Sequence, residues 1–164
     1  MSLLRSLALS IGDPALSSRW LASIDGMNAP ELVVEAINPG LTTIGSTQRF
    51  YAGLMQDFPD TANVPAISIT FFETDDYKVT AWLRDWLNLI YDPETEVWGL
   101  PIQYKKRMEV RLYRGDSNSP SAAFELLQVW PTTPAPFDFS YANAEGRVTV
   151  TAEFQVAFSK FWRL

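Results

Sequence analysis

The sequence predicts a mainly β domain of the α+β class, an antiparallel β-barrel or sandwich carrying one packed amphipathic helix. Several segments alternate apolar and polar residues, which is typical of antiparallel strands with one solvated face. One segment has helical periodicity instead. The length of 164 residues, 47% of them hydrophobic and 20% charged, suits one globular domain with one core. We therefore expect residues 1–164 to form a single domain.

The first 12 residues are expected to form a short helical arm. Their apolar side chains are spaced along one face of a helix, and Arg5 interrupts them. The uninterrupted apolar run is too short for a signal peptide and far too short to cross a bilayer. The sequence thus predicts neither secretion by a signal peptide nor membrane anchoring.

Two early strands are expected over residues 18–25 and 31–37, the second with Leu32, Val34 and Ala36 on one face, before a turn at 38–40. Residues 40–64 mix turn formers with large apolar side chains and are expected to form a long irregular loop. Its aromatic residues either contact a partner or tuck under the core of the domain itself, and the pattern leaves both possibilities open. These aromatic residues are Phe50, Tyr51 and Phe58.

A strand followed by a helix is expected in the middle of the chain. Over Pro65–Glu73, the alternate residues Ile67, Ile69 and Phe71 share a face. An apolar helical stripe follows, with Thr74 or Asp75 at its start and Asp92-Pro93 at its end. This stripe places Trp82 and Trp86 in the core rather than on a ligand. It consists of Val79, Trp82, Leu83, Trp86, Leu87 and Ile90.

Three further strands complete the prediction. Residues 107–114 alternate, with Met108, Val110 and Leu112 on one face, and a hairpin connection at 115–120 leads to a strand over 122–130 that ends at the proline-rich residues 131–136. The longest strand is expected over Arg147–Phe158. Its even positions from Val148 to Phe158 are apolar, and its opposite face is polar. The polar row comprises Thr149, Thr151, Glu153 and Gln155.

Composition excludes the commonest catalytic devices. The chain has no cysteine and no histidine, so neither a thiolate nor a histidine triad can form, and zinc sites that use these ligands are excluded as well. Asp75 and Asp76 fit helix capping better than acid–base catalysis. The acidic stretch 92–96 fits a solvated turn better than a calcium loop. We therefore predict no catalytic residues, no cofactor and no metal.

Charge is unevenly distributed. The net charge is −6, so the chain as a whole is a poor ligand for nucleic acid. A basic strand nevertheless gathers Lys105, Lys106, Arg107 and Arg111, whereas residues 57–96 are strongly acidic. The basic strand could bind nucleic acid, meet the acidic segment of a neighbouring copy or simply be solvated. Because the chain as a whole is acidic, contact with a neighbouring copy and simple solvation are favoured over nucleic-acid binding.

Ordered motifs over residues 65–162 resemble the tail tube proteins of contractile-tailed bacteriophages. These motifs run from the strand 67–71 through Asp85-Trp86-Leu87-Asn88, Asp92-Pro93 and Gly99-Leu100-Pro101 to Tyr104-Lys105-Lys106, Trp130-Pro131-Thr132 and the closing pair Phe161-Trp162. The resemblance covers both the major tube protein and the tube initiator of the baseplate. Tubes of type six secretion and of other contractile injection systems share this fold.

The resemblance implies hexameric rings that stack into a tube whose lumen conducts DNA without binding it specifically. It implies contacts with other copies of the chain, with baseplate and tube proteins and with a sheath, in a virion tail assembled in the host cytoplasm. We expect the polar row 149–155 to face the lumen, the loop 40–64 to contact the next ring and the basic strand to contact a neighbouring subunit. A monomeric β-sandwich that binds sugar or peptide, and a carboxylate hydrolase, are the competing functions.

Overall fold

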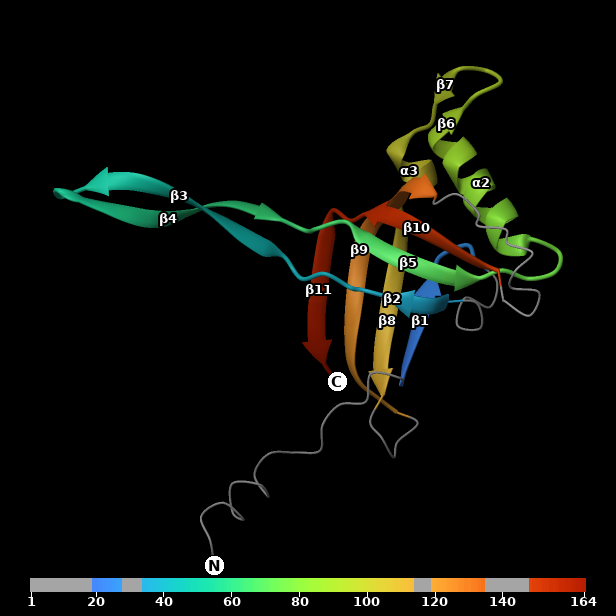
Figure 1. The fold of residues 1–164 in the computed structure, drawn as a ribbon, viewed down its shortest axis with the longest axis horizontal. Helices are drawn as coiled ribbons and strands as arrows, with labels where there is room; N and C mark the ends of the chain where they lie inside the picture. Colours follow the sequence, from blue (N-terminus) through green and yellow to red (C-terminus); the bar gives the residue numbers. More distant parts are fainter. Residues whose placement is uncertain (1–18, 28–33, 114–118, 135–147) are drawn as a thin grey trace, which may run out of the picture.

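The computed structural model describes residues 19–27, 34–113, 119–134 and 148–164. The helical arm predicted for residues 1–12 and most of the connection 115–120 lie outside these ranges. Within them, the chain is mostly strand, in antiparallel sheets, with one substantial helix (Figure 1). The predicted fold class is therefore confirmed.

Two β-sheets share one long strand. The first sheet runs β1 (Trp20–Ile24), β8 (Lys106–Tyr113), β9 (Pro120–Pro134) and β11 (Phe158–Arg163). The second runs β2 (Val34–Ile37), β5 (Ile67–Phe72), β10 (Thr149–Gln155) and the end of β9. Every pairing is antiparallel, and the strands of the second sheet cross in front of those of the first in Figure 1.

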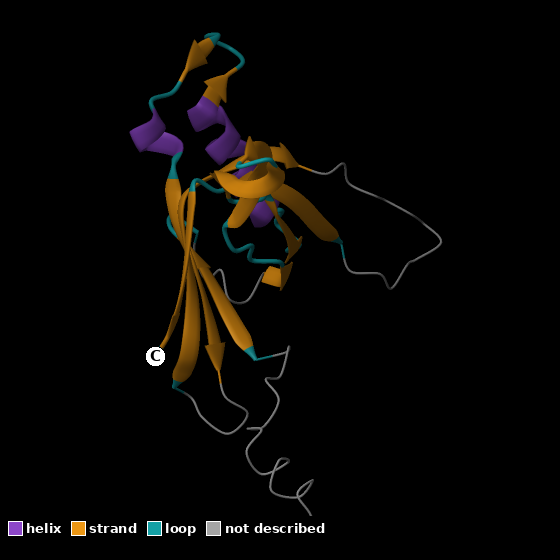
Figure 2. Cartoon of the chain, turned by 90° about the vertical axis from the view of Figure 1, so that its left-hand side faces the viewer, coloured by secondary structure: helices purple, strands orange, loops and turns teal. Residues whose placement is uncertain are grey.

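Helix α2 (Lys78–Ile90) completes the core between the sheets. Trp86 is buried on α2 and packs against Phe154 of β10, with 5.5 Å between the ring centroids. Trp82 is partly buried and lies edge-on to Phe71 of β5. The short helix α3 (Pro101–Tyr104) and the small hairpin of β6 (Tyr91–Asp92) and β7 (Val97–Trp98) follow α2 at the same end of the molecule (Figure 2). The helix thus covers the open end of the sandwich.

Strand β9 continues through the prolines that were expected to break it. Between Leu126 and Val129 it carries a bulge, and Gln128 there adopts a φ of 56°. The bulge lies where β9 leaves β8 and turns toward β10. Pro131 then lies opposite Phe154, at a second register irregularity, where a missing N–H is tolerated. The predicted end at 131–136 is therefore wrong.

The predicted closing strand over 147–158 is two strands instead of one. Val150, Ala152 and Phe154 are buried on β10, as the alternation predicts. The chain turns at Val156–Ala157 from the second sheet to the first, and Phe158, 56% exposed, already pairs with Leu127 on β11. The buried apolar row therefore ends at Val156. The sequence does not reveal this, because the alternation of apolar and polar residues continues through the turn.

Two smaller predictions are also corrected. Ala36 is exposed although Val34 is buried, because an irregularity in the pairing with β5 lies between them. The start of α2 is capped by Glu73, which was not expected, rather than by Asp75. Thr74 contributes one long hydrogen bond, accepting from the Lys78 N–H at 3.4 Å.

Candidate assembly surfaces

Residues 40–64 form a long hairpin, which corrects the prediction of an irregular loop. Strand β3 (Thr43–Tyr51) pairs with β4 (Leu54–Asn63), and the hairpin projects far from both sheets (Figure 1). Within the described ranges no third strand pairs with it. Ala52 and Gly53 close the turn with φ values of 49° and 83°, the left-handed conformations that a two-residue hairpin turn requires.

The hairpin ends in an exposed apolar tip. Phe50 pairs with Met55, and Tyr51 pairs with Leu54, directly before and after the turn. Their exposed fractions run from 61% for Met55 to 72% for Phe50. Phe58 lies further down β4 and is less exposed than the residues next to the turn, at 36%. A cluster of this kind on a projecting element is typical of a surface that contacts another protein. We call Phe50, Tyr51, Leu54 and Met55 the hairpin tip.

The polar row of β10 lies on the outer face of the second sheet. Thr149 and Glu153 are exposed, and Thr151 and Gln155 are half-buried. The Thr151 hydroxyl is 3.1 Å from the Thr70 hydroxyl on β5, so the row continues across the sheet. This face carries hydroxyl groups and one carboxylate per chain from the row, and it points away from the core.

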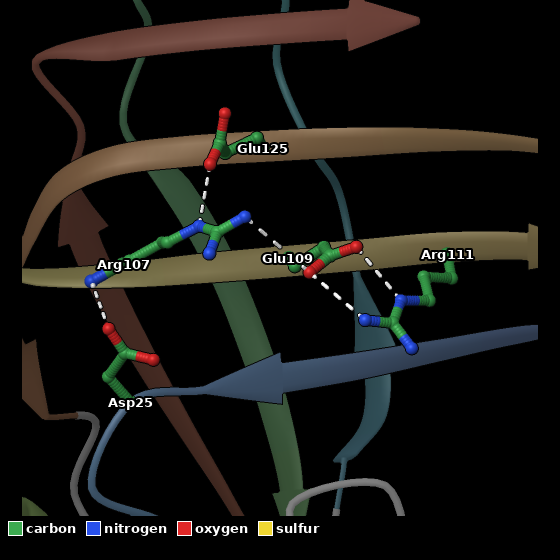
Figure 3. Close-up of polar contacts among 5 residues, drawn as sticks. All are labelled: Asp25, Arg107, Glu109, Arg111 and Glu125. Carbon is green, nitrogen blue, oxygen red and sulfur yellow. Dashed lines mark hydrogen bonds and ion pairs between the residues drawn. The ribbon is translucent and has the colours of Figure 1, made fainter. Parts of the chain in front are cut away.

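The basic strand is largely neutralised within the chain (Figure 3). The Arg107 guanidinium lies 2.6 Å from Glu125 of β9 and 3.8 Å from Glu109, and Arg111 lies 2.8 Å from Glu109. Hydrogen bonding to Arg111 lowers the pKa of Glu109 and raises the pKa of Arg111. Because Glu109 and Glu125 lie directly opposite each other, the two arginines also relieve a like-charge pair.

The two lysines of the basic strand have a different environment. The Lys106 ammonium lies over the rings of Trp86 and Trp82, 4.5 and 5.5 Å from their centroids. Burial lowers the pKa of Lys106, and Asp25 partly offsets this effect. Lys105 donates to Gln128 at 3.2 Å and lies over Trp130. The two arginines and the two lysines therefore have different surroundings. The sequence analysis missed Glu125 as a partner of Arg107, because only the pairing of β8 with β9 brings the two side chains together.

The acidic residues considered for chemistry have structural partners. Asp92 accepts hydrogen bonds from the Glu94 N–H and the Thr95 hydroxyl, and the latter lowers the pKa of Asp92. Asp76 pairs with Lys78 at 2.6 Å, which lowers the pKa of Asp76. In the described part of the chain, no three acidic side chains gather in a way that could hold a metal ion. No helix there is long and apolar enough to span a bilayer.

The edges of both sheets are open in the described part of the chain. In the first sheet, β1 pairs only with β8 and β11 pairs only with β9. In the second, β2 pairs only with β5. Open edges present unpaired N–H and C=O groups that another chain can extend. The subunit therefore combines extendable sheets with a projecting apolar hairpin, which are features of a protein built for assembly.

A family model of phage tail tube proteins matches residues 32–161, and the chain belongs to this family. Members of the family are structural tube subunits. The family model thus assigns the chain to the class of tail tube proteins. No curated protein matches the sequence at a significant level.

Solved structures show the same fold at low sequence identity. The tube-terminating cap of the anti-feeding prophage is 11% identical, with a TM-score of 0.73 and 94% of each chain covered. A subunit of the extended sheath–tube complex of the PVC extracellular contractile injection system is 12% identical, with a TM-score of 0.71 over 100% of this chain and 99% of that one. Hcp1 of Flavobacterium johnsoniae is 12% identical, with a TM-score of 0.50 over 89% and 98%.

Proposed function

We propose that this protein is a tube subunit of a contractile-tailed bacteriophage, serving either in the main tube or as the initiator at the baseplate. Six copies form a ring, the rings stack, and DNA passes through the lumen. The particle is a virion tail assembled in the host cytoplasm, where the tube also contacts baseplate proteins and the sheath. The hairpin of β3 and β4 is the observation that carries this proposal, because no other described segment of the chain covers its apolar tip.

The open sheet edges support ring formation. Among the described strands, β1 and β11 each have one unpaired edge, and such an edge gains backbone hydrogen bonds when a neighbouring copy adds its own strand. Closure of such additions around an axis leaves no free edge and encloses a channel. Arg107 and Arg111 are half-exposed, so their outer sides remain able to contact a neighbouring subunit, as predicted for the basic strand.

The lumen assignment rests on the polar row of β10. A channel that conducts DNA must not bind its phosphate groups. A wall of hydroxyl groups and carboxylates meets this condition, because it offers no cation to the phosphates. Thr149, Thr151, Glu153 and Gln155 supply such a surface. The face that bears Arg107, Glu109, Arg111 and Glu125 is the other outer surface of the sandwich, and its paired charges also sum to zero.

The test is electron microscopy of the purified chain. We expect rings of six copies and stacked tubes, and a particle mass of six subunits under conditions that separate the rings. A variant in which a short Gly-Ser turn replaces residues 44–62 should form folded subunits that do not stack. A well-behaved monomer at high concentration, or tubes that persist without the hairpin, would contradict the proposal.

Tubes of other contractile injection systems are the second candidate function. The observation that favours it is the fold shared with the PVC sheath–tube subunit over the whole of this chain. The two functions differ in the cargo that passes through the lumen. Nuclease-protected DNA in particles that contain this chain supports the phage tail, and particles that never carry DNA support the injection system.

A further inference from the structure

A second exposed apolar surface lies at the end of α2, which we call the knob. It consists of the last residues of α2, the hairpin β6–β7 and the start of α3, and it presents large side chains to solvent. Ile102 is 87% exposed and Trp98 is 73% exposed, whereas most residues of this size on α2 are covered. Exposed apolar patches of several such residues mark sites of protein contact. The patch comprises Leu89, Tyr91, Val97, Trp98, Leu100 and Ile102.

The knob is held rigidly. The Trp98 ring packs on Tyr91 with 5.0 Å between centroids. The Gly99 N–H donates to the carbonyl of Ile90 at 2.9 Å, and any Cβ at Gly99 would overlap the carbonyl oxygen of Leu89. The Leu100 N–H donates to the side chain of Gln103 at 3.0 Å. A fixed aromatic platform binds with little loss of conformational entropy.

The charges beside the two exposed apolar surfaces are complementary. Asp92, Glu94 and Glu96 lie in the turn of the knob, and the sequence has no basic residue between Asp85 and Tyr104. Arg49 is the only basic residue between Val34 and Tyr77, and it lies directly before the hairpin tip, whereas the nearest acidic residue of the hairpin, Asp57, pairs with Gln48 one step further from the tip. An apolar tip flanked by a cation therefore matches an apolar platform flanked by carboxylates.

The two surfaces cannot meet within one chain. The hairpin projects to one side of the sheets, whereas the knob extends beyond the end of α2 in another direction (Figure 1). We propose that the hairpin tip of one copy docks on the knob of a second copy, with Arg49 facing the acidic turn. Such a head-to-tail contact repeats without limit, as a growing tube requires. The inference rests on the proposed function and names the receptor of the hairpin.

Disulfide cross-linking tests the contact, since the natural chain has no cysteine. Tyr51→Cys and Val97→Cys variants are mixed, assembled and oxidised. We expect cross-linked dimers in this mixture and in neither variant alone. The matched control replaces Val97→Cys by Lys78→Cys, at another exposed residue, which lies at the opposite end of α2. Tubes that assemble but give no more cross-linking than the control would overturn the inference and leave the proposed function standing.

Complementation supplies the second test. The tip variant carries Phe50→Ser and Tyr51→Ser, and the knob variant carries Trp98→Ser and Ile102→Ser. All four side chains are exposed, so both variants should fold, which circular dichroism checks. Neither variant should stack alone. A mixture should stop at pairs of rings, because only one intact tip–knob contact is available. Long tubes from either variant alone would overturn the inference.

A charge exchange separates the docking site from general adhesion. Arg49→Glu should abolish stacking, and Glu94→Lys together with Glu96→Lys in the same chain should restore it. Failure of the exchange, with the cross-link also absent, refutes the contact. A wild-type chain that forms neither rings nor tubes refutes both the contact and the proposed function, so the two failures are distinguishable.

Discussion

The carboxylate of Glu73 organises the junction between β5 and α2, and its removal should destabilise the subunit measurably. It accepts hydrogen bonds from the N–H groups of Thr74 at 2.9 Å, Val79 at 3.1 Å and Thr80 at 2.9 Å, and from the Thr80 hydroxyl. The residue that precedes the helix, Tyr77, makes no side-chain cap. Glu73 therefore satisfies two N–H groups that the first turn of α2 leaves without a helical partner.

The expected loss for Glu73→Ala is about 2 kcal/mol. Loss of a helix cap costs about 0.5–2 kcal/mol, and hydrogen bonds to charged groups contribute about 1.5–3 kcal/mol each. The site is half-buried, so water reaches part of the freed N–H groups and the total stays near the upper end of the capping range. A loss of this size lowers the folding equilibrium constant about 30-fold.

Urea unfolding followed by tryptophan fluorescence measures this loss. The experiment uses the tip variant, so that stacking does not contribute to the free energy of unfolding. Every sample has the same subunit concentration, so that association within a ring contributes equally to all of the variants. The matched control is Glu153→Ala, the same chemical change at an exposed residue of β10. We expect the control to change stability by less than about 0.5 kcal/mol. Equal losses in the two variants would refute the capping role of Glu73.

Three further outcomes are expected. Trp86→Ala should lower the free energy of unfolding by about 3–5 kcal/mol in the same urea assay. The Trp86 ring is buried in the core, and its indole N–H donates to the backbone carbonyl of Tyr104. A loss below about 1 kcal/mol would contradict this packing. Gly99→Ala should block assembly and lower the free energy of unfolding by about 1–3 kcal/mol, because the added methyl group overlaps the Leu89 carbonyl; unchanged tubes in micrographs would contradict it. The lowered pKa of Glu109 means that its pairing with Arg111 stabilises the fold above the pKa of the unfolded chain, and that this stability is lost as the pH falls through the folded-state pKa. Glu109→Gln should therefore flatten the acid limb of stability against pH, and an unchanged limb would show that the pair does not contribute.

The elements that contact the core could be predicted from the sequence. Strand β5 and helix α2 were found because burial on one face imposes a period on their residues, and Ile69, Phe71 and Trp86 lie where that period places them. The inward face of β8 follows for the same reason. In each of these elements, the pattern of apolar residues records the packing directly.

The hairpin could not be predicted in this way. Every residue of β4 is exposed, so no face of the strand distinguishes inside from outside. Its turn, Ala52-Gly53, lacks the Asn-Gly or Asp-Gly signal of common two-residue hairpins. A strand without a buried face has no alternation to mark it, so the sequence pattern predicts a loop here.

Features that depend on three-dimensional register were also beyond the sequence. The Arg107–Glu125 pair joins two strands, and only their alignment brings these side chains together. The chain changes sheets at the corner between β10 and β11, but the sequence alternation continues through it, which is why the pattern predicts one strand as far as Phe158. The hairpin tip and the knob are recognised by the exposure of their apolar side chains, and the spacing of residues in the sequence does not indicate that exposure.

The attachment of the hairpin has a mechanical consequence. Its two arms continue directly into β2 and β5, which are themselves paired, and β5 is paired along its length with β10 (Figure 1). A pull along the hairpin therefore loads rows of backbone hydrogen bonds in shear, so that they must yield together rather than one at a time. If the hairpin joins two rings, a pull between them would be carried by the paired strands β2, β5 and β10 together rather than by the hairpin arms alone.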